Sequence, residues 1–280
     1  MAAAAAAAVT GSIAGCGQPA PACELEAEPS LVLFRSISFA RVDAANVSEG
    51  FDLDGRVSDR SDLGSCRKPD FTSPDGTPGI DNQIAVLLPI IEMQTGGLRL
   101  DDVLQTAIDN GQLLIAFELL GVDDPVNDPC VTVRLRPVVG TPLLGTDGRV
   151  LPGQTFDVAP DGEVSTIEGG RIVDGVLAVG PAPVALPVQV LDARFTLHVE
   201  GAQVRLERNE DGTWRGLLGG GISVEEMIQI ARGLNIPSDL MGAVMFVLRS
   251  NADLARDEAG DCQQISATLV VDGVPAFLYE

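Results

Sequence analysis

Histidine, lysine and large aromatic side chains are nearly absent from this sequence of 280 residues. It contains one His, one Trp and one Tyr, and Lys68 is its only lysine. A single His, His198, excludes metal sites that need two histidines, including those of the HExxH zinc proteases. The scarcity of aromatic rings counts against a carbohydrate site, because sugars usually stack on such rings.

Basic residues of either kind are too few to make a positively charged face. The chain has 18 Lys and Arg residues against 40 Asp and Glu residues, which gives a net charge of −22. Binding of nucleic acid or of anionic lipid headgroups needs a basic surface, so the composition argues against both. No run of about 18 apolar residues occurs that could form a transmembrane helix. Hydrophobic residues still make up 45% of the chain, enough for one large core or two modest ones.

The residue pattern predicts a β-rich α+β fold, with antiparallel strands in a sandwich or barrel-like sheet and two inserted helical pairs. Alternating or short apolar segments predict strands over 31–42, 113–120, 131–139, 154–158, 172–179, 193–206 and 265–278. Helical spacing predicts helices over 81–93, 100–109, 223–234 and 238–248. We interpret Asp81 as the N-cap of the first helix and Ser223 with Glu226 as a capping box. Asn110-Gly111 is expected to end the second helix, and Asn209-Glu210-Asp211-Gly212 is expected to form a hairpin turn. The glycine-rich segment 216–221 is interpreted as a tight crossover from strand to helix.

The N-terminal segment has the composition of an export signal followed by a tether. Residues 2–8 are all alanine, residues 1–16 form a signal-like segment, and residues 17–30 are rich in Pro and Glu. Residues 31–280 are then expected to form a single β-rich globular domain, or two closely packed halves. The alternative for the first segment is ordinary low complexity, because the positive charge usual at the start of a signal is missing.

Ile13-Ala14-Gly15-Cys16 resembles the lipobox of bacterial lipoproteins. That resemblance implies that Cys16 is lipidated and becomes the first residue of the mature protein. It also implies that the protein is exported to the cell envelope, as an outer-membrane lipoprotein or in the periplasm.

Four cysteines remain if Cys16 carries lipid, and an even number in an exported chain suggests two disulfides. Cys66, Cys130 and Cys262 all lie in Asp-rich segments, and we expect at least one disulfide among these three. The alternative is that some are free buried thiols, which are common. No CxxC spacing occurs, so zinc-ribbon and thioredoxin-like sites have no support.

The most informative segment, 51–83, contains seven aspartates within 30 residues: Asp52, Asp54, Asp59, Asp62, Asp70, Asp75 and Asp81. Calcium takes six to eight oxygen ligands, which irregular backbone rich in Asp, Asn and Gly can supply. We therefore predict a calcium site formed by Asp52, Asp54, Asp75, Asp81 and Asn82. The alternative is that these residues only form turns, as Asp and Gly often do. A second candidate is the acidic loop with Asp253, Asp257, Glu258 and Asp261.

The aspartate pattern resembles the calcium loops of thrombospondin-type repeats and dockerins, where DxDG and DGxxD steps recur. The segment Pro74–Gln83, which reads PDGTPGIDNQ, is similar to a segment of uncharacterised bacterial secreted lipoproteins. These resemblances imply a calcium-binding loop and an exported location, and they imply no reaction.

Two functions follow as hypotheses. The first is an exported, lipid-anchored protein whose calcium-stabilised, disulfide-braced domain is a binding or structural module. The second is a hydrolase that uses paired carboxylates on extracellular glycan or peptide. We identify no catalytic or cofactor-binding residues besides the candidate calcium ligands, and we interpret His198 as a surface residue. The expected partner is a protein or another envelope component, with membrane contact only through the lipid anchor.

Overall fold

The computed structural model describes residues 29–94, 96–190, 193–233 and 238–279. Within these ranges the helices are α1 (Ile84–Gln94), α2 (Leu100–Asp109), α3 (Val224–Gly233) and α4 (Ser238–Ser250). The longer strands are β1 (Ser30–Phe39), β4 (Ile115–Leu120), β5 (Asp128–Val139), β7 (Ser165–Val173), β8 (Val176–Val190), β9 (Ala193–Arg208), β10 (Trp214–Ser223) and β12 (Cys262–Pro275). The short strands are β2 (Phe71–Thr72), β3 (Pro78–Ile80), β6 (Thr155–Val158), β11 (Leu254–Arg256) and β13 (Phe277–Tyr279).

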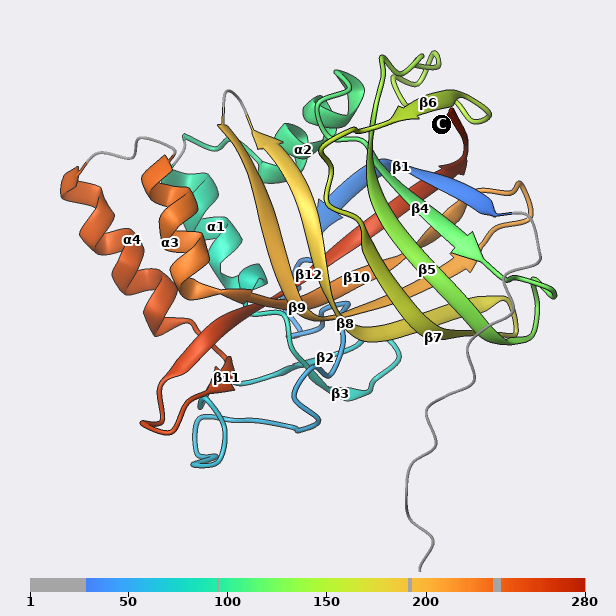
Figure 1. Ribbon diagram of the computed structural model, residues 1–280. Helices are drawn as coiled ribbons and strands as arrows, with labels where there is room; N and C mark the ends of the chain where they lie inside the picture. The colour runs from blue at the N-terminus through green and yellow to red at the C-terminus, as the bar shows by residue number, and fades with distance from the viewer. Residues whose placement is uncertain (1–28, 95, 191–192, 234–237, 280) are drawn as a thin grey trace, which may run out of the picture.

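The eight longer strands close into an antiparallel barrel (Figure 1). Each pairs with its neighbours in the order β1, β12, β10, β9, β8, β7, β5 and β4, and β4 pairs back with β1. The pairing of β5 with β7 closes the ring, with Leu135 opposite Ser165. This architecture confirms the prediction of a β-rich α+β fold with a barrel-like sheet and inserted helices.

The helices gather at one end of the barrel (Figure 1). Helix α2 packs on β1, α1 on β12, and α3 on β9, β10 and β12, while α4 packs against α3. The opposite half of the barrel is filled by side chains, among them Leu177, Leu206 and Trp214. Phe34 and Phe117 pack at its middle, with ring centroids 5.9 Å apart. The barrel therefore has a packed half and a half that the helices cover.

Helix α2 spans the predicted residues 100–109. Its C-cap is Asn110, and Gly111 adopts a positive φ of 72°, so this Asn-Gly pair ends the helix as expected. The predicted hairpin turn is also present, since Gly212 donates to the Asn209 carbonyl between β9 and β10. Local signals at the ends of elements were sufficient in both places.

Two sequence interpretations of the central strands were wrong. Residues 172–179 form the end of β7, a turn and the start of β8, because Asp174 and Gly175 both have positive φ. Residues 216–221 lie within β10, in the middle of the barrel wall, and do not cross to a helix. A Cβ on Gly219 would lie 2.7 Å from the Phe51 ring, and one on Gly220 would lie 2.5 Å from Val199. These glycines permit close packing on both faces of the strand.

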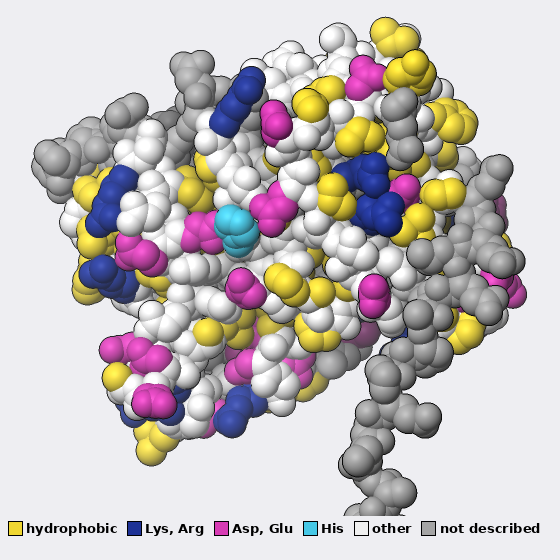
Figure 2. All heavy atoms as spheres, in the orientation of Figure 1, with side chains coloured by type: hydrophobic (Ala, Val, Ile, Leu, Met, Phe, Trp, Pro, Cys, Tyr) yellow, Lys and Arg dark blue, Asp and Glu magenta, His cyan; other side chains and the backbone are white. Residues whose placement is uncertain are grey.

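The Asp81 cap was also wrong, since the Asp81 carboxylate accepts from the Leu53 amide and α1 begins at Ile84. The Ser223 hydroxyl accepts from the Glu226 amide at 3.5 Å, as the capping box predicts. The Glu226 carboxylate does not complete the box, because it accepts from the His198 amide at 2.9 Å and contacts its imidazole Nδ1 at 2.8 Å. His198 is an exposed residue with acidic side chains on either side (Figure 2). The hydrogen bond to Glu226 raises the pKa of His198. The pair fixes the start of α3 to β9.

Candidate metal centre and apolar cavity

Three of the predicted calcium ligands come together in the structure. One carboxylate oxygen from each of Asp52, Asp54 and Asp81 lies within 4.8 Å of the other two. Asp52 and Asp54 are exposed on the loop after an isolated bridge between Phe51 and Asp81, and Asp81 is buried beneath them. Three carboxylate oxygens in this space match the hard oxygen ligands that calcium prefers, with backbone carbonyls and water left to complete the shell.

The backbone beside the acidic trio, which is Asp52, Asp54 and Asp81, is fixed by hydrogen bonds to the side chains of Asp52 and Asp54. Asp52 accepts from the amides of Gly55 and Arg56, at 2.7 and 3.1 Å, and Asp54 also accepts from Arg56. Opposite them, Gly79 has a φ of 89°, and a Cβ there would lie 2.7 Å from the Arg56 carbonyl. The Asp-x-Asp-Gly turn and a left-handed glycine thus bring two segments separated by about 25 residues into contact.

Burial raises the pKa of several carboxyl groups in this region. The pKa of Asp81 is raised from 3.8 to about 8, chiefly by burial, and the charges of Asp54, Asp253 and Asp70 add to the effect. Burial also raises the pKa of Asp70 to about 6 and that of Asp54 above its ordinary value. Each of these carboxylates makes it harder to ionise its neighbours. A divalent cation would remove that repulsion.

The other two predicted ligands have different positions. Asp75 is exposed, and its carboxylate accepts from the Ser73 hydroxyl and the Thr77 amide, which form a local turn. The side-chain amide of Asn82 is buried; it donates to the Ala40 carbonyl and to Ser48, and its oxygen accepts from the Thr268 amide. Asp52, Asp54 and Asp81 therefore lie close together. Asp75 lies in a separate turn, and Asn82 joins the loop to β12 through its hydrogen bond with Thr268.

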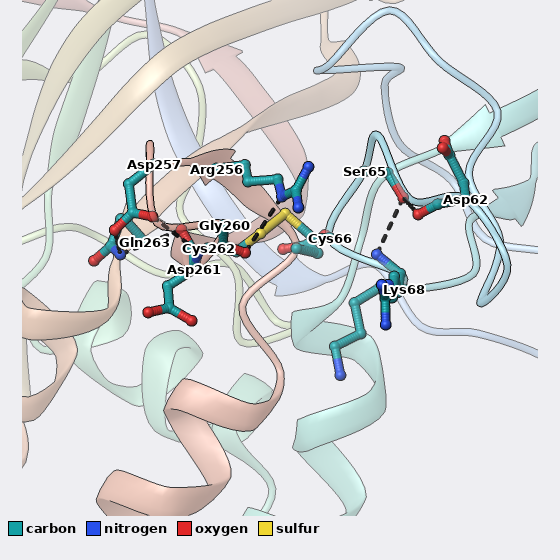
Figure 3. Close-up of a disulfide and its surroundings, with 12 residues drawn as sticks. Asp62, Ser65, Cys66, Lys68, Arg256, Asp257, Gly260, Asp261, Cys262 and Gln263 are labelled. Carbon is teal, nitrogen blue, oxygen red and sulfur yellow. Dashed lines mark hydrogen bonds between the residues drawn. A yellow bond between two sulfur atoms is a disulfide. The ribbon is translucent and has the colours of Figure 1, made fainter.

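A disulfide between Cys66 and Cys262 ties the aspartate loop to the start of β12 (Figure 3). Their Cα atoms are 6.0 Å apart across a sequence separation of 196 residues. This bond confirms the expectation of a disulfide among Cys66, Cys130 and Cys262. Cys130 also takes part in a disulfide. The predicted signal segment, the predicted lipidation site Cys16 and most of the predicted tether lie outside the described residues.

The second acidic loop has its own structural contacts. Asp253 is buried and accepts from the amide and hydroxyl of Ser266 on β12. Asp257 accepts from the Asp261 amide and from the Gln263 side chain, beside the disulfide (Figure 3). In the described part of the chain the metal-type grouping involves the first loop, and the second loop forms a turn that supports Cys262.

An apolar cavity of about 270 Å³ lies inside the helix-covered half of the barrel. All 23 residues that line it are hydrophobic, and they come from the barrel strands and from α1, α2 and α3. Typical members from these elements are Ile37, Leu88, Leu104, Phe195, Ile222 and Met227. Three Phe rings face this space, and none of its lining residues carries a carboxylate. A hydrolase that uses paired carboxylates would need two acidic side chains beside its ligand cavity. Among the described residues, the acidic side chains do not gather at this cavity.

The volume of this cavity is large for a space with no occupant. Protein interiors are close-packed and keep few voids larger than a water molecule. About half of the lining side chains are partly exposed, so the space opens to solvent, and apolar surface in contact with water costs roughly 25 cal/mol per Å². Apolar walls also give water no hydrogen-bond partners, so water does not fill the space well. An apolar ligand offsets this cost.

Sequence reasoning did not find this cavity. The alternation in 193–199 correctly puts Phe195, Leu197 and Val199 on one face, and all three line the cavity. Alternation shows which face is apolar, but it does not show whether the facing strands fill the space between them.

Comparisons of this chain with protein-family models, with curated proteins and with solved structures gave no match. None of the helices in the described ranges has the length and hydropathy needed to cross a bilayer. The cavity and the acidic trio are therefore the features of this structure that bear on its function.

Proposed function

We propose that this protein is an exported, lipid-anchored binding protein that holds a small apolar ligand inside its barrel. The observation that carries the proposal is the cavity of about 270 Å³ with 23 hydrophobic lining residues. Ligand pockets in proteins are typically apolar cavities of about 300–1,000 Å³, so this one suits a small ligand. The ligand supplies the contacts that the walls lack, and a preformed apolar pocket binds without ordering new backbone.

Filling the cavity is expected to abolish this binding. Ala267 lines the cavity from β12, and the Ala267→Phe variant puts a ring into the space. We expect the affinity for a neutral naphthylamine dye, followed by its fluorescence, to fall by roughly tenfold or more, because ring and dye compete for one volume. The melting temperature of the ligand-free protein should not fall, since the ring fills a void.

The matched control is Ala178→Phe, the same change at an exposed position of β8. Its dye binding should equal that of the unmodified protein. Equal binding by Ala267→Phe and Ala178→Phe would place the dye outside the barrel and contradict the proposal. Native mass spectrometry of gently purified protein supplies an independent test, because a retained apolar ligand adds a defined mass.

We also propose that calcium binds at Asp52, Asp54 and Asp81 and orders the aspartate loop. The closeness of the three carboxylates and the raised pKa of Asp81 support this proposal. A ligand that binds only the folded state adds about 2.7 kcal/mol to stability at a hundredfold excess over its Kd. Calcium should therefore raise the melting temperature of the protein, and a chelator should reverse the effect.

Paired substitution of Asp52 and Asp54 by Asn is expected to remove most of the calcium-dependent rise in melting temperature. Each Asn keeps a ligand oxygen but loses the negative charge that attracts the ion. The control is the pair Asp147→Asn and Asp161→Asn, at exposed aspartates of other turns. If the two double variants lose the same part of the calcium-dependent rise in melting temperature, calcium acts by general screening of charge. That result would contradict a calcium site at Asp52, Asp54 and Asp81.

An exported location is proposed from Cys16 and from the cysteine chemistry. A disulfide such as Cys66–Cys262 is compatible with an exported protein, because cytosolic thiols are kept reduced. Lipidation of Cys16 would attach the domain to a membrane through residues 17–30. A mass of the native protein that includes residues 1–15 and no lipid would contradict the anchor.

A further inference from the structure

One side of the apolar cavity is closed by a helix, at a place where the barrel wall lacks a strand. The ladder between β9 and β10 ends at the pair of Val199 and Ile222, and α3 begins at Val224 directly after β10. Residues 193–198, the first part of β9, pair with β8, and no strand pairs with their other edge among the described residues. Helix α3 packs on β9 here. We call the boundary between residues 193–198 and α3 the β9–α3 seam.

The side chains that line the cavity along this seam are partly exposed. Phe195 and Leu197 of β9 and Met227 and Ile230 of α3 line the cavity from the two sides of the seam. All four are partly exposed, whereas Val199, at the end of the ladder with β10, is buried. Separation of α3 from β9 would open the cavity without breaking a ladder of the barrel, and such local openings need less free energy than global unfolding.

The carboxylate of Glu226 joins the two sides of the seam. Glu226 lies in the first turn of α3, where it accepts from the His198 backbone amide at 2.9 Å and lies 2.8 Å from the imidazole Nδ1. The His198 amide lies one residue outside the ladder between β9 and β10, so this carboxylate takes the place of a strand as its acceptor. The start of α3 is therefore held against β9 by a side chain and not by a ladder.

The imidazole of His198 has acidic side chains around it (Figure 2). Its Nε2 lies 3.8 Å from a carboxylate oxygen of Glu163, which precedes β7, while Glu226 faces it from α3 and Glu200 follows it on β9. Its pairing partner on β8 is Ala185, which has no charge. The hydrogen bond to Glu226 and the charges of these carboxylates raise the pKa of His198. The protonated ring offsets the repulsion among the carboxylates and so holds Glu226 in place.

We infer that the β9–α3 seam is the entrance of the apolar cavity, and that the contact between Glu226 and His198 holds this entrance closed. The inference rests on the proposed function, because it assigns the route by which the ligand reaches that cavity. The contact is strongest with His198 protonated, below the ordinary histidine pKa of about 6.5. It weakens as the pH rises through the raised pKa of His198, because the neutral ring no longer attracts the carboxylates.

Stopped-flow mixing of the protein with the neutral naphthylamine dye tests this entrance. Glu226→Gln should raise the association and dissociation rates of the dye by about two- to fivefold, the range for an exposed ion pair. The Kd should stay within about twofold, because opening an entrance raises both rates together. In the unmodified protein both rates should rise between about pH 5.5 and about pH 8.5, where histidine loses its charge. His198→Gln should remove this rise.

Glu225→Gln is the matched control, one residue earlier in the same turn of α3. The Glu225 carboxylate lies 3.6 Å from Arg232 and accepts from Gln229, and both partners belong to α3. The rates of this variant and their pH dependence should equal those of the unmodified protein. Equal rates in Glu226→Gln and Glu225→Gln would place the entrance elsewhere and overturn this inference, while the binding of dye upholds the cavity. Absence of dye binding to the unmodified protein would overturn the proposed function and this inference together.

Discussion

Replacing Cys66 and Cys262 by Ala is expected to lower the free energy of unfolding by about 5 kcal/mol. The disulfide closes a loop of 196 residues, and loop-closure entropy predicts a stabilisation of this size for so long a loop. It also fixes the aspartate loop, which has little regular structure of its own, to the barrel strand β12. Urea unfolding of the double variant and of the unmodified protein measures the difference.

Addition of a reducing agent provides the control for this prediction. It should shift the unfolding of the double variant less than that of the unmodified protein, because the variant has already lost this bond. The disulfide of Cys130 remains in both, so its reduction affects both proteins alike. Unfolding free energies that agree within about 1 kcal/mol would show that the native contacts alone hold the loop in place.

The fold could be predicted where short-range signals decide the structure. The spacing of apolar residues and the Asn110-Gly111 stop gave both ends of α2, and alternation gave the inward face of β9. Closure of the barrel depends on the pairing of β5 with β7, which join residues 30 to 44 positions apart. No local pattern specifies such a pairing, so the sequence left a sandwich and a barrel equally open.

The candidate site divides in the same way. The Asp52-Leu53-Asp54-Gly55 turn is a local motif, and its two carboxylates do lie together. Asp81 lies beside this turn because it forms an isolated bridge with Phe51, 30 residues earlier. Asp75 instead forms a separate turn, in which its carboxylate accepts from Ser73 and Thr77. Composition identified the segment, but only the long-range contacts select which aspartates meet.

In the absence of calcium, the stability of this protein is expected to fall as the pH rises from about 4 to about 8. Asp81 has a pKa raised from 3.8 to about 8, so the folded state binds its proton more tightly than the unfolded state. The stability from this proton is fully present below about pH 4 and is lost as the pH rises through about 8. The shift corresponds to on the order of 5 kcal/mol, at about 1.4 kcal/mol per pH unit. Asp253, with a pKa raised to about 7, and Asp70, raised to about 6, act in the same direction.

Calcium should reverse this dependence, because it binds the ionised carboxylates and competes with their protons. The gain in unfolding free energy on adding calcium should therefore be small near pH 5 and largest near pH 8. Asp81→Asn should flatten the pH dependence measured with chelator and remove most of the calcium gain, since the amide carries no charge at either pH. Asp147→Asn, at an exposed turn, should leave both curves unchanged. A calcium gain of the same size at both pH values would mean that the ion does not bind the carboxylates whose pKa burial raises. In that case calcium binds elsewhere, and the aspartates of this loop serve only to form its turns.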